Sequence, residues 1–378
     1  MRVTVIHNAL NGNRPDQEDT LVQAHAVHGA LESLGVASSV LPVTLNLEDA
    51  RRQLAAARPD VVFNLVEELA DDIRLAPMAP ALLAHMGLPF TGSDAASLTL
   101  SGDKVLCKRV LAAAGVPSPA WILPDGTGDL TGDLTGGISG AGKGMGTGAA
   151  TGPGSAFTPA RYICKSVHEH ASLGLDDDCV VHARSPEEVT ARLALFTRRH
   201  GGQWFAERFV DGREFNVAML ESETGGDPQV LSPAEMEFCD FGPDRPKIVG
   251  YAAKWDESAF EYAHTVRAFP FAGTDAAHPQ HATHPLHTVL REAATACWHA
   301  FGLSGYARVD FRVDGTGTPG DPYVPYAIDV NTNPCIAPDA GLAAAAAMDG
   351  LPYPGLVLRV VHAALRRHAG ISQPHTAA

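Results

Sequence analysis

The sequence predicts an α/β protein of two or three domains that begins with a doubly wound parallel sheet. Over the first hundred residues, short apolar runs alternate with amphipathic helical patterns, which is typical of right-handed βαβ units. Later segments alternate apolar and polar residues, which is typical of half-buried strands. A chain of 378 residues is also too long for one small core.

The N-terminal elements follow in regular order. Residues 2–7 predict a strand, and residues 19–34 predict an amphipathic helix that ends at Gly35. A doubly wound domain is therefore expected to end near Ser101. Its further elements are a strand near 38–41, a helix near 47–57, a strand at 60–66, and a short strand and turn at 87–92.

A capped helix and a glycine-rich segment come next. Asp103 is expected to cap a helix over residues 104–114, and a strand follows at 121–123. Residues of about 125–156 contain little besides Gly, Ala, Thr, Ser and a repeated Gly-Asp-Leu-Thr, so they cannot offset their ordering entropy by burying apolar area. We expect a mobile insertion. Its P-loop-like run Gly137–Lys143 continues with Gly144 where Ser or Thr should bind Mg²⁺, which indicates a chance match.

The remaining chain is rich in strands. Ser185 begins a capping box, which predicts a helix to about Arg199. Asp211-Gly212 predicts a hairpin turn between strands at 203–209 and 214–221. Further strands are expected at 161–166, at 179–182 and within 231–251. Four histidines lie around the start of a helix expected from Leu286, namely His278, His281, His284 and His287. Prolines interrupt this run of histidines, which favours a solvated loop over a metal site.

Composition excludes several classes of function. The formal net charge is −15 and no basic stripe is present, which argues against nucleic acid or an anionic membrane as a main partner. No stretch resembles a signal peptide or reaches transmembrane length. The 6 cysteines lie far apart without a C-x-x-C pair, so reduced thiols in the cytoplasm are expected.

Two strands near the C-terminus carry a convergent set of polar residues. In residues 306–313 the odd positions are apolar and the even positions polar, whereas residues 323–331 alternate in the opposite sense. If Asp310 lies opposite Asp329 in an antiparallel pair, Arg308 falls opposite Asn331 and all four share one face. The apolar residues Val324, Tyr326, Ile328 and Val330 then face the core.

Such a pairing predicts a divalent metal site. Opposed residues have Cβ atoms about 4.5–5.5 Å apart, so two carboxylates there repel unless a cation lies between them. Mg²⁺ typically takes one or two carboxylates together with phosphate oxygens. An exposed sheet face with an Arg308 salt bridge is the alternative, but four converging groups favour the metal, with Asp310, Asp329 and Asn331 as ligands.

With these residues the sequence resembles the ATP-grasp superfamily, and within it the D-alanine–D-alanine ligase group. The resemblance covers residues 2–124 and 160–368, in the family's order. It implies three α/β domains, at 1–101, 102–207 and 208–378, with ATP held between the central and C-terminal ones.

The resemblance also implies roles for individual residues. Lys104 and Lys165 would contact the ATP phosphates, and Ser172 in the run Ala171–Gly174 would belong to the loop that closes over them. Lys254 would lie in a covering loop, and Arg308 would stabilise the tetrahedral intermediate. The adenine hinge would be Glu207, Arg208, Phe209 and Val210, and Glu214 would hold the ribose hydroxyls.

The substrate end departs from the family pattern. Asp16 or Glu18 replaces the expected N-terminal signature as a contact for an amino group, and Glu68 stands near the position of a His-Gly pair. Residues 338–341, which end at Gly341, lack the serine that would bind a dipeptide carboxylate. We therefore expect an amino-acid substrate other than D-alanine.

Together these features predict an ADP-forming carboxylate–amine ligase that works through an acyl phosphate. It would use ATP with Mg²⁺, or alternatively Mn²⁺, on small-molecule acid and amine substrates, and related enzymes are commonly homodimers. Two alternatives stay open: an authentic D-alanine–D-alanine ligase of cell-wall synthesis, and a non-catalytic ATP-binding regulator. A carrier-carboxylating subunit is disfavoured because no carrier-presenting domain is evident.

Overall fold

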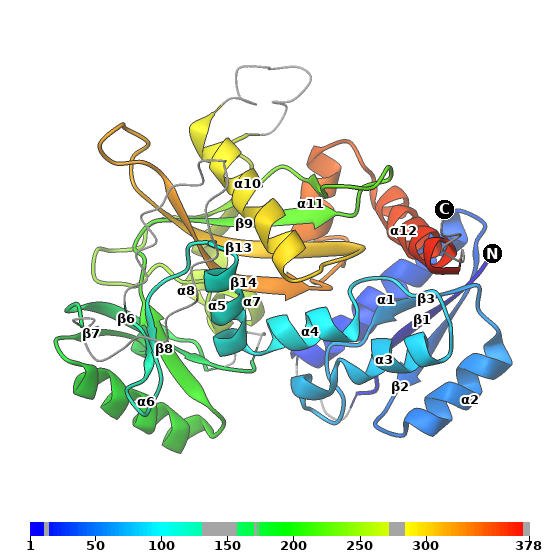
Figure 1. Cartoon of the computed structure of the whole chain (residues 1–378), viewed down its shortest axis with the longest axis horizontal. Coiled ribbons are helices and arrows are strands. Elements are labelled where there is room, and N and C mark those ends of the chain that lie inside the picture. Colours follow the sequence, from blue (N-terminus) through cyan, green and yellow to red (C-terminus); the bar gives the residue numbers. More distant parts are fainter. Residues whose placement is uncertain (11–14, 131–156, 170–171, 173, 272–283, 373–378) are drawn as a thin grey trace, which may run out of the picture.

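The computed structural model describes residues 1–10, 15–130, 157–169, 172, 174–271 and 284–372 (Figure 1). Three sheets with flanking helices make up this part of the chain. The strand orders are β2-β1-β3, then β5-β4-β8-β6-β7, and then β12-β11-β9-β13-β14 with β10 paired to β9. Within the described residues, no helix combines the length and apolar character needed to cross a membrane.

The first sheet is parallel, as the alternation of strands and helices predicts. Its central strand β1 pairs with β2 on one side and β3 on the other. Helix α2 begins and ends where predicted, because the Asn46 side chain accepts from the Asp49 amide and Arg58 adopts a left-handed φ of 46°. The elements are β1 (Arg2–Asn8), α1 (Pro15–Ser33), β2 (Ala37–Val43), α2 (Leu47–Ala57), β3 (Val61–Leu65), η1 (Ile73–Leu75) and α3 (Met78–His85).

The second sheet is antiparallel and carries α6 against it. Residues 128–129 pair with β4, so the glycine-rich insertion begins later than expected; the P-loop-like run lies outside the described residues. The elements are α4 (Ala95–Gly102), α5 (Lys104–Ala113), β4 (Trp121–Ile122), β5 (Gly128–Asp129), β6 (Ala160–Ser166), η2 (Asp177–Cys179), β7 (Val180–Ala183), α6 (Pro186–His200) and β8 (Trp204–Arg208).

The third sheet is also antiparallel and contains the two polar strands predicted to bind metal. Residues 239–250 form no strand, contrary to expectation, and Pro243 and Pro246 in that segment lack the amide donors that a strand needs. Its elements are β9 (Arg213–Leu220), β10 (Gln229–Val230), β11 (Ala234–Phe238), α7 (Tyr251–Trp255), α8 (Phe260–His264), β12 (Thr265–Ala268), α10 (Pro285–Ala300), β13 (Tyr306–Asp314), β14 (Val324–Thr332), α11 (Gly341–Met348) and α12 (Tyr353–Ser372).

Two sequence interpretations concern the histidine run. His278 and His281 lie outside the described residues. The His284 side chain accepts from the Leu286 amide and caps α10, and His287 is buried within that helix. His284 therefore begins the helix close to the expected start, whereas the expected solvated position is wrong for His287, which is 3% exposed.

The hairpin predicted at Asp211-Gly212 is wrong. Strand β8 pairs with β4 and β6 in the second sheet, whereas β9 pairs with β10, β11 and β13 in the third. A Cβ on Gly212 would lie 1.9 Å from the carbonyl oxygen of Val313. Glycine is therefore required because the chain passes close to β13 as it crosses between sheets, and the Asp-Gly pair makes no two-residue turn.

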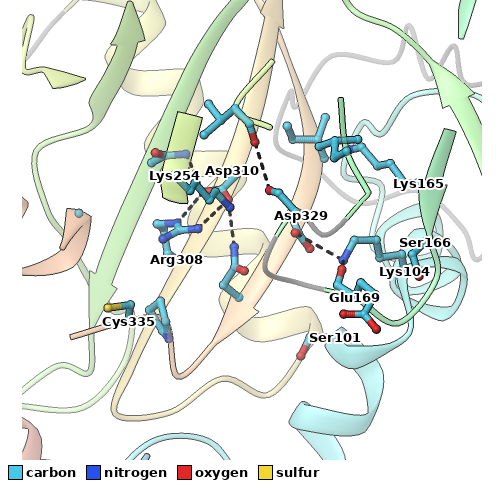
Figure 2. Close-up of a pocket in the computed structure, with 18 of the residues that line it drawn as sticks. Ser101, Lys104, Lys165, Ser166, Glu169, Lys254, Arg308, Asp310, Asp329 and Cys335 are labelled. Atoms are coloured by element: carbon cyan, nitrogen blue, oxygen red, sulfur yellow. Dashed lines mark hydrogen bonds and ion pairs between the residues drawn. The ribbon is translucent and has the colours of Figure 1, made fainter. Parts of the chain in front are cut away.

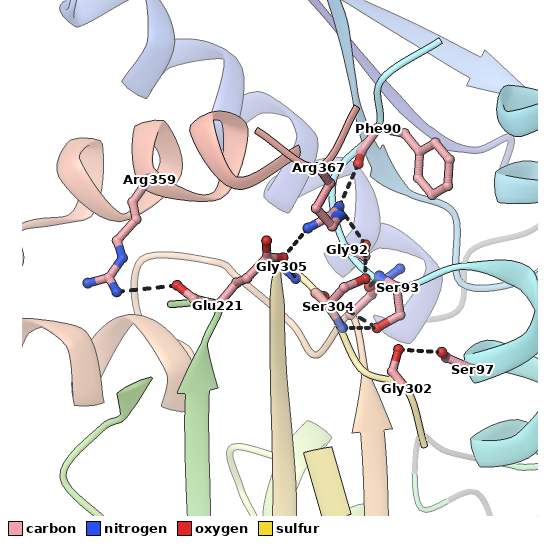
Figure 3. Close-up of polar contacts among 11 residues, drawn as sticks. Phe90, Gly92, Ser93, Ser97, Glu221, Gly302, Ser304, Gly305, Arg359 and Arg367 are labelled. Atoms are coloured by element: carbon pink, nitrogen blue, oxygen red, sulfur yellow. Dashed lines mark hydrogen bonds and ion pairs between the residues drawn. The ribbon is translucent and has the colours of Figure 1, made fainter. Parts of the chain in front are cut away.

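A polar network connects the first sheet to the third (Figure 3). Arg367 on α12 donates to the Glu221 carboxylate after β9 and to the carbonyl oxygens of Phe90 and Gly92, at 3.0 and 3.1 Å. The Glu221 carboxylate also accepts from the Gly305 amide at 2.7 Å. We call Arg367, Glu221 and their backbone partners the α12 network.

A second connection lies beside this network. The Asn333 side chain accepts from the Ser93 amide at 2.9 Å, and a Cβ on Gly92 would lie 2.1 Å from the Asn333 Oδ1 atom. Gly92 has a φ of +79°, a region that side chains rarely adopt. The end of β14 is therefore held directly against the segment that follows the first sheet.

Candidate active site

A cavity of about 710 Å³ opens among the three sheets. Its walls come from the ends of β1 and β3, from α1 and α5, from β6 and β8, and from β13 and β14. It therefore gathers residues that are distant in the sequence, and almost all of the predicted site residues that the structure describes lie along it.

The predicted register of the polar strands is confirmed. Asp310 lies opposite Asp329, and Arg308 lies opposite Asn331. A β-bulge between Asp310 and Phe311 then shifts the pairing, so that Phe311 faces Ala327. The polar face is therefore continuous up to the bulge and changes phase beyond it.

The bulge corrects one expectation about β14. Ile328 was expected to face the core, but it lines the cavity. Ala327 is fully buried and packs in the apolar core of the third sheet together with Phe311 and Val330. The extra residue reverses which side chains point inward, and alternation alone gives no sign of it.

Several neighbouring side chains donate to the Asp310 carboxylate (Figure 2). It accepts from Arg308 Nε and Nη2 at 2.7 and 2.9 Å, from Asn216 at 2.8 Å and from Asn331 at 3.1 Å. Burial alone would lower the pKa of Arg308, but the adjacent Asp310 outweighs it and raises that pKa above its ordinary value. The guanidinium is therefore charged and fixed in direction by its fork-shaped contact.

The polar face fits a divalent ion that also binds phosphate. Asn331 turns its amide nitrogen to Asp310, which leaves its oxygen as a donor atom for a metal. Asp329 lies opposite Asp310, and its carboxylate is 3.7 Å from the Lys104 ammonium. Among the described residues, no three His, Cys, Asp or Glu side chains gather as a complete metal site. Two carboxylates and an amide match the incomplete shell that Mg²⁺ completes with phosphate oxygens and water.

A buried triad of charges includes two residues that line the cavity, Glu207 and Lys165. Glu207 is 1% exposed, and its carboxylate oxygens lie 2.6 Å from Lys108 and 2.5 Å from Lys165. Burial would raise the pKa of Glu207, but the two ammonium groups outweigh it and hold that pKa below its ordinary value. Burial would likewise lower the pKa of Lys165, and Glu207 raises it instead. Glu207 and Lys165 are therefore charged at neutral pH.

Another part of the cavity is lined largely by apolar side chains. Its polar members are Glu214 and Arg312, which form a buried ion pair at 2.8 Å. The other hinge residues, Arg208 and Val210, also line the cavity. The apolar lining consists of Ile163, Leu175, Trp204, Phe209, Met236, Ile248 and Ile328.

Lys254 and Ser172 approach the cavity from its covering segments. Ser172 has a φ of 60° and donates to the Val249 carbonyl at 3.2 Å, whereas Ala171 lies outside the described residues. Lys254 keeps contact with solvent at the end of α7. Protein atoms crowded around its ammonium lower the pKa of Lys254, as does the Arg308 charge, while Asp310 acts in the opposite direction.

Only some of the predicted substrate contacts lie along the cavity. Glu68 and Gly341 line the cavity. The side chain of Asp16 lies outside the described residues. Glu18 is exposed and does not line the cavity; Asp19 lines it instead. Successive helical residues point about 100° apart, so an error of one position turns the side chain away from the site.

A network at this end was not predicted. Gln23 is 1% exposed, donates to Asp19 at 2.9 Å and to Glu67 at 3.2 Å, and accepts from the Ile336 amide at 3.1 Å. The Cys335 thiol donates to Asp19 at 3.4 Å. Gln23 follows Asp19 by one helical turn. Polar residues one helical turn apart are the signal that could have revealed both networks. Asp19 and Gln23 have this spacing on the buried face of α1, and Lys104 and Lys108 have it on α5.

Comparison with known proteins shows the family of the chain. Residues 161–362, more than half of the chain, match the family described as D-ala D-ala ligase C-terminus. The D-alanine–D-alanine ligases of Gloeobacter violaceus and Gluconobacter oxydans are 26% and 28% identical, each over 97% of this chain and 100% of their own length. An uncharacterized protein of Sinorhizobium fredii, y4sG, is 26% identical over 82% of this chain and 76% of its own length.

Solved structures share the fold. D-alanine–D-alanine ligase from Bacillus anthracis complexed with ATP has a TM-score of 0.63 at 18% identity, covering 98% of this chain and 100% of that one. The enzyme from Coxiella burnetii gives 0.61 at 17% identity, with coverages of 98% and 95%. The predicted α/β ATP-grasp fold is thereby confirmed. The chain therefore belongs to the D-alanine–D-alanine ligase family of ADP-forming ATP-grasp ligases.

Proposed function

We propose that this chain uses ATP to convert a carboxylate into an acyl phosphate and then joins the acyl group to an amine, releasing ADP and phosphate. One observation carries the proposal: a single cavity holds Lys104, Lys165 and Lys254 together with the polar face of Arg308, Asp310, Asp329 and Asn331. Cations for the phosphates, donors for a metal and a fixed guanidinium are the parts that this chemistry needs.

Each group has a physical task. A carboxylate is a poor acyl donor because its leaving group would be oxide, whereas an acyl phosphate, a mixed anhydride, releases phosphate as a good leaving group. The lysines hold and neutralise the transferred phosphoryl group, which is mostly positioning and charge compensation. Mg²⁺, or Mn²⁺ as the alternative, would be held by Asp310, Asp329 and Asn331 and would supply neutralisation of phosphate charge when bound.

Arg308 acts on the acyl group. Asp310 holds its guanidinium at two nitrogens, so the charge is directed before the reaction begins. As the amine attacks, negative charge grows on the acyl oxygen, and a preoriented cation stabilises it. Removing one such donor typically lowers the rate by about 10²–10³-fold.

We further propose three domains, at residues 1–101, 102–207 and 208–378, with ATP between the second and third sheets. The first, second and third sheets each have an apolar core of their own, which supports the division. A further core is shared between the first sheet and β9, β13, α11 and α12. The core of the third sheet also contains Cys107 and Leu111 of α5, which favours a central domain whose own core begins after that helix. The homodimer and the cytoplasmic location stay predictions.

The substrates are a small-molecule acid and an amine, and we propose an amino acid other than D-alanine as one of them. The cavity wall after β14 carries Asp339, Ala340 and Gly341 without a hydroxyl group for a dipeptide carboxylate. Asp19, Glu67 and Glu68 line the same end and suit a substrate ammonium. The names of the relatives favour the second candidate, an authentic D-alanine–D-alanine ligase.

Phosphate release in a panel of amino acids and small acids with ATP and Mg²⁺ tests the proposal. We expect turnover with an amino-acid pair and weak turnover with D-alanine alone. Efficient D-alanyl-D-alanine formation would instead establish the second candidate. Tight ATP binding without ADP release in any mixture would favour a non-catalytic regulator.

Two variants test the assigned roles once a substrate pair is known. Asp329→Ala and Arg308→Ala should each abolish measurable turnover while circular dichroism and the unfolding midpoint stay close to those of the parent. Asp314→Ala is a matched control, because Asp314 ends the same strand β13 but is exposed and outside the cavity. Retained turnover in either cavity variant would overturn the role of that residue.

A further inference from the structure

Arg312 is a buried arginine at the nucleotide end of the cavity. It lies on β13 two residues beyond Asp310, is 4% exposed and lines the cavity. Neither the metal face nor the acyl-group chemistry uses it. A buried guanidinium needs a reason, because an unpaired charge in the interior is strongly unfavourable.

The contacts of Arg312 converge from four segments. Its Nη2 atom lies 2.8 Å from Glu214 Oε2 and also donates to the Lys247 carbonyl, and its Nη1 atom donates to the Gly212 carbonyl at 3.0 Å. The guanidinium carbon lies 5.4 Å from the ring centroids of both Phe209 and Phe238. The side chain is therefore fixed in position, direction and charge.

Glu214 depends on this arrangement. It is 6% exposed, and Arg312 is the cationic partner of its carboxylate inside the protein. Arg312 engages Oε2, and within the described residues no further contact of this carboxylate is present. Because Glu214 also lines the cavity, its Oε1 atom is the one available to a ligand.

Packing alone does not account for an arginine here. A methionine or leucine would fill the space between two phenylalanine rings without any charge to compensate. A buried ion pair is often no more stabilising than an apolar pair of the same volume. The guanidinium adds what an apolar side chain lacks, namely a charged and correctly aimed carboxylate at the edge of the nucleotide site.

We propose that Arg312 is the positioning residue for Glu214 and thereby sets the preference of the site for ribonucleotides over 2′-deoxyribonucleotides. The inference rests on the proposed function, in which Glu214 holds the ribose hydroxyls. A carboxylate fixed at one oxygen presents the other to the 2′-hydroxyl. Loss of a hydrogen bond to a charged group costs about tenfold or more in affinity.

Binding of ATP and 2′-deoxy-ATP, each with Mg²⁺, measured by titration calorimetry on the full chain tests this without any acid or amine. The variants are Glu214→Gln, Arg312→Met and the double substitution. Arg213→Met is the matched control, because Arg213 also pairs with a carboxylate, Glu235, and stacks on a ring, Phe215, but lies outside the cavity.

We expect the parent to bind ATP about tenfold or more tightly than 2′-deoxy-ATP. Glu214→Gln and Arg312→Met should each reduce this ratio to near one, and the double variant should reduce it no further. Arg213→Met should keep the parent ratio. An Arg312→Met variant that keeps the ratio, or that weakens both nucleotides equally, would overturn the positioning role.

The two levels of the proposal fail differently. If the parent binds both nucleotides equally, or if Glu214→Gln keeps the parent ratio, the assignment of Glu214 to ribose fails. The role of Arg312 then fails with it. If Glu214→Gln reduces the ratio but Arg312→Met does not, only the inference on Arg312 fails. If Arg312→Met does not fold, Arg312→Lys is used instead, because it keeps the charge but lacks the two-nitrogen guanidinium. This variant should reduce the ratio partially. A full parent ratio in it would contradict the need for the guanidinium.

Discussion

Individual residues show how this protein keeps charge in its interior. Lys108 and Glu207 are each 2% exposed or less and face one another in the triad with Lys165. Every member of the triad has an opposite charge within hydrogen-bonding distance, which is the condition under which ions persist away from water. The triad lies between α5 and the second sheet, so it also fixes the helix that carries Lys104.

Lys108→Met should destabilise the fold by about 3 kcal/mol, because the buried Glu207 then keeps only one cationic partner. Urea unfolding monitored by circular dichroism measures the change. Arg51→Met is the control, since Arg51 forms an exposed pair with Glu48 on α2 and should leave the midpoint unchanged. Equal, small effects in both variants would contradict the importance of the buried triad.

The triad also predicts how stability depends on pH. Burial raises the pKa of Glu207 less than its two lysines lower it, so the pKa lies below the ordinary 4.5. A carboxyl with a depressed folded pKa stabilises the fold fully above its unfolded pKa and loses that contribution as pH falls through the folded value. Unfolding midpoints should therefore fall steeply below about pH 4.5 and less steeply in Glu207→Gln. Identical slopes would count against this assignment.

Secondary-structure elements show where sequence reasoning succeeds and where it stops. The caps of α5 and α6 and the alternation in β13 and β14 are local patterns, and the helix starts and the strand register followed from them. The bulge at Phe311 and the crossing at Gly212 depend on which strand packs nearby. Those contacts join residues about 20 to 100 positions apart, and no local pattern encodes them.

Ile328→Ala should weaken ATP binding about tenfold with little change in stability, because the bulge turns this side chain into the cavity. The loss of affinity follows from about 0.8 kcal/mol for each buried methylene. Calorimetric titration with ATP and urea unfolding measure the two effects. Val330→Ala is the paired variant on the core face of β14 and should show the reverse. A loss of stability without a loss of affinity in Ile328→Ala would mean that Ile328 packs in the core.

Across the whole molecule, the site is assembled by contacts between sheets. The α12 network connects the last long helix to the ends of β9 and β13 and to the segment after the first sheet. Gln23 similarly joins α1 to the segments after β3 and β14. Periodicity predicts most of the strands and helices, and the family resemblance implies three domains, but these connections exist only once the domains have packed.

Arg367→Met should lower the free energy of unfolding by about 2 kcal/mol, because Glu221 loses a charged partner and two carbonyls lose their donor. Thermal and urea unfolding measure this change. Arg366→Met is the matched control, since Arg366 is the adjacent arginine on α12 and is exposed. If both variants unfold alike, the α12 network does not stabilise the assembly.

The contact between Gly92 and Asn333 limits how this enzyme can be recombined with its relatives. Any larger residue at position 92 would collide with the Asn333 side chain, so each half of the contact constrains the other. A chimera that exchanges the first sheet as a block must therefore import a glycine at the junction, because a φ of +79° strains any other residue there even if Asn333 is replaced. Grafting new specificity is better done in place, by substituting the cavity-lining residues of α1 and of the segment after β3, because such grafts leave this junction intact.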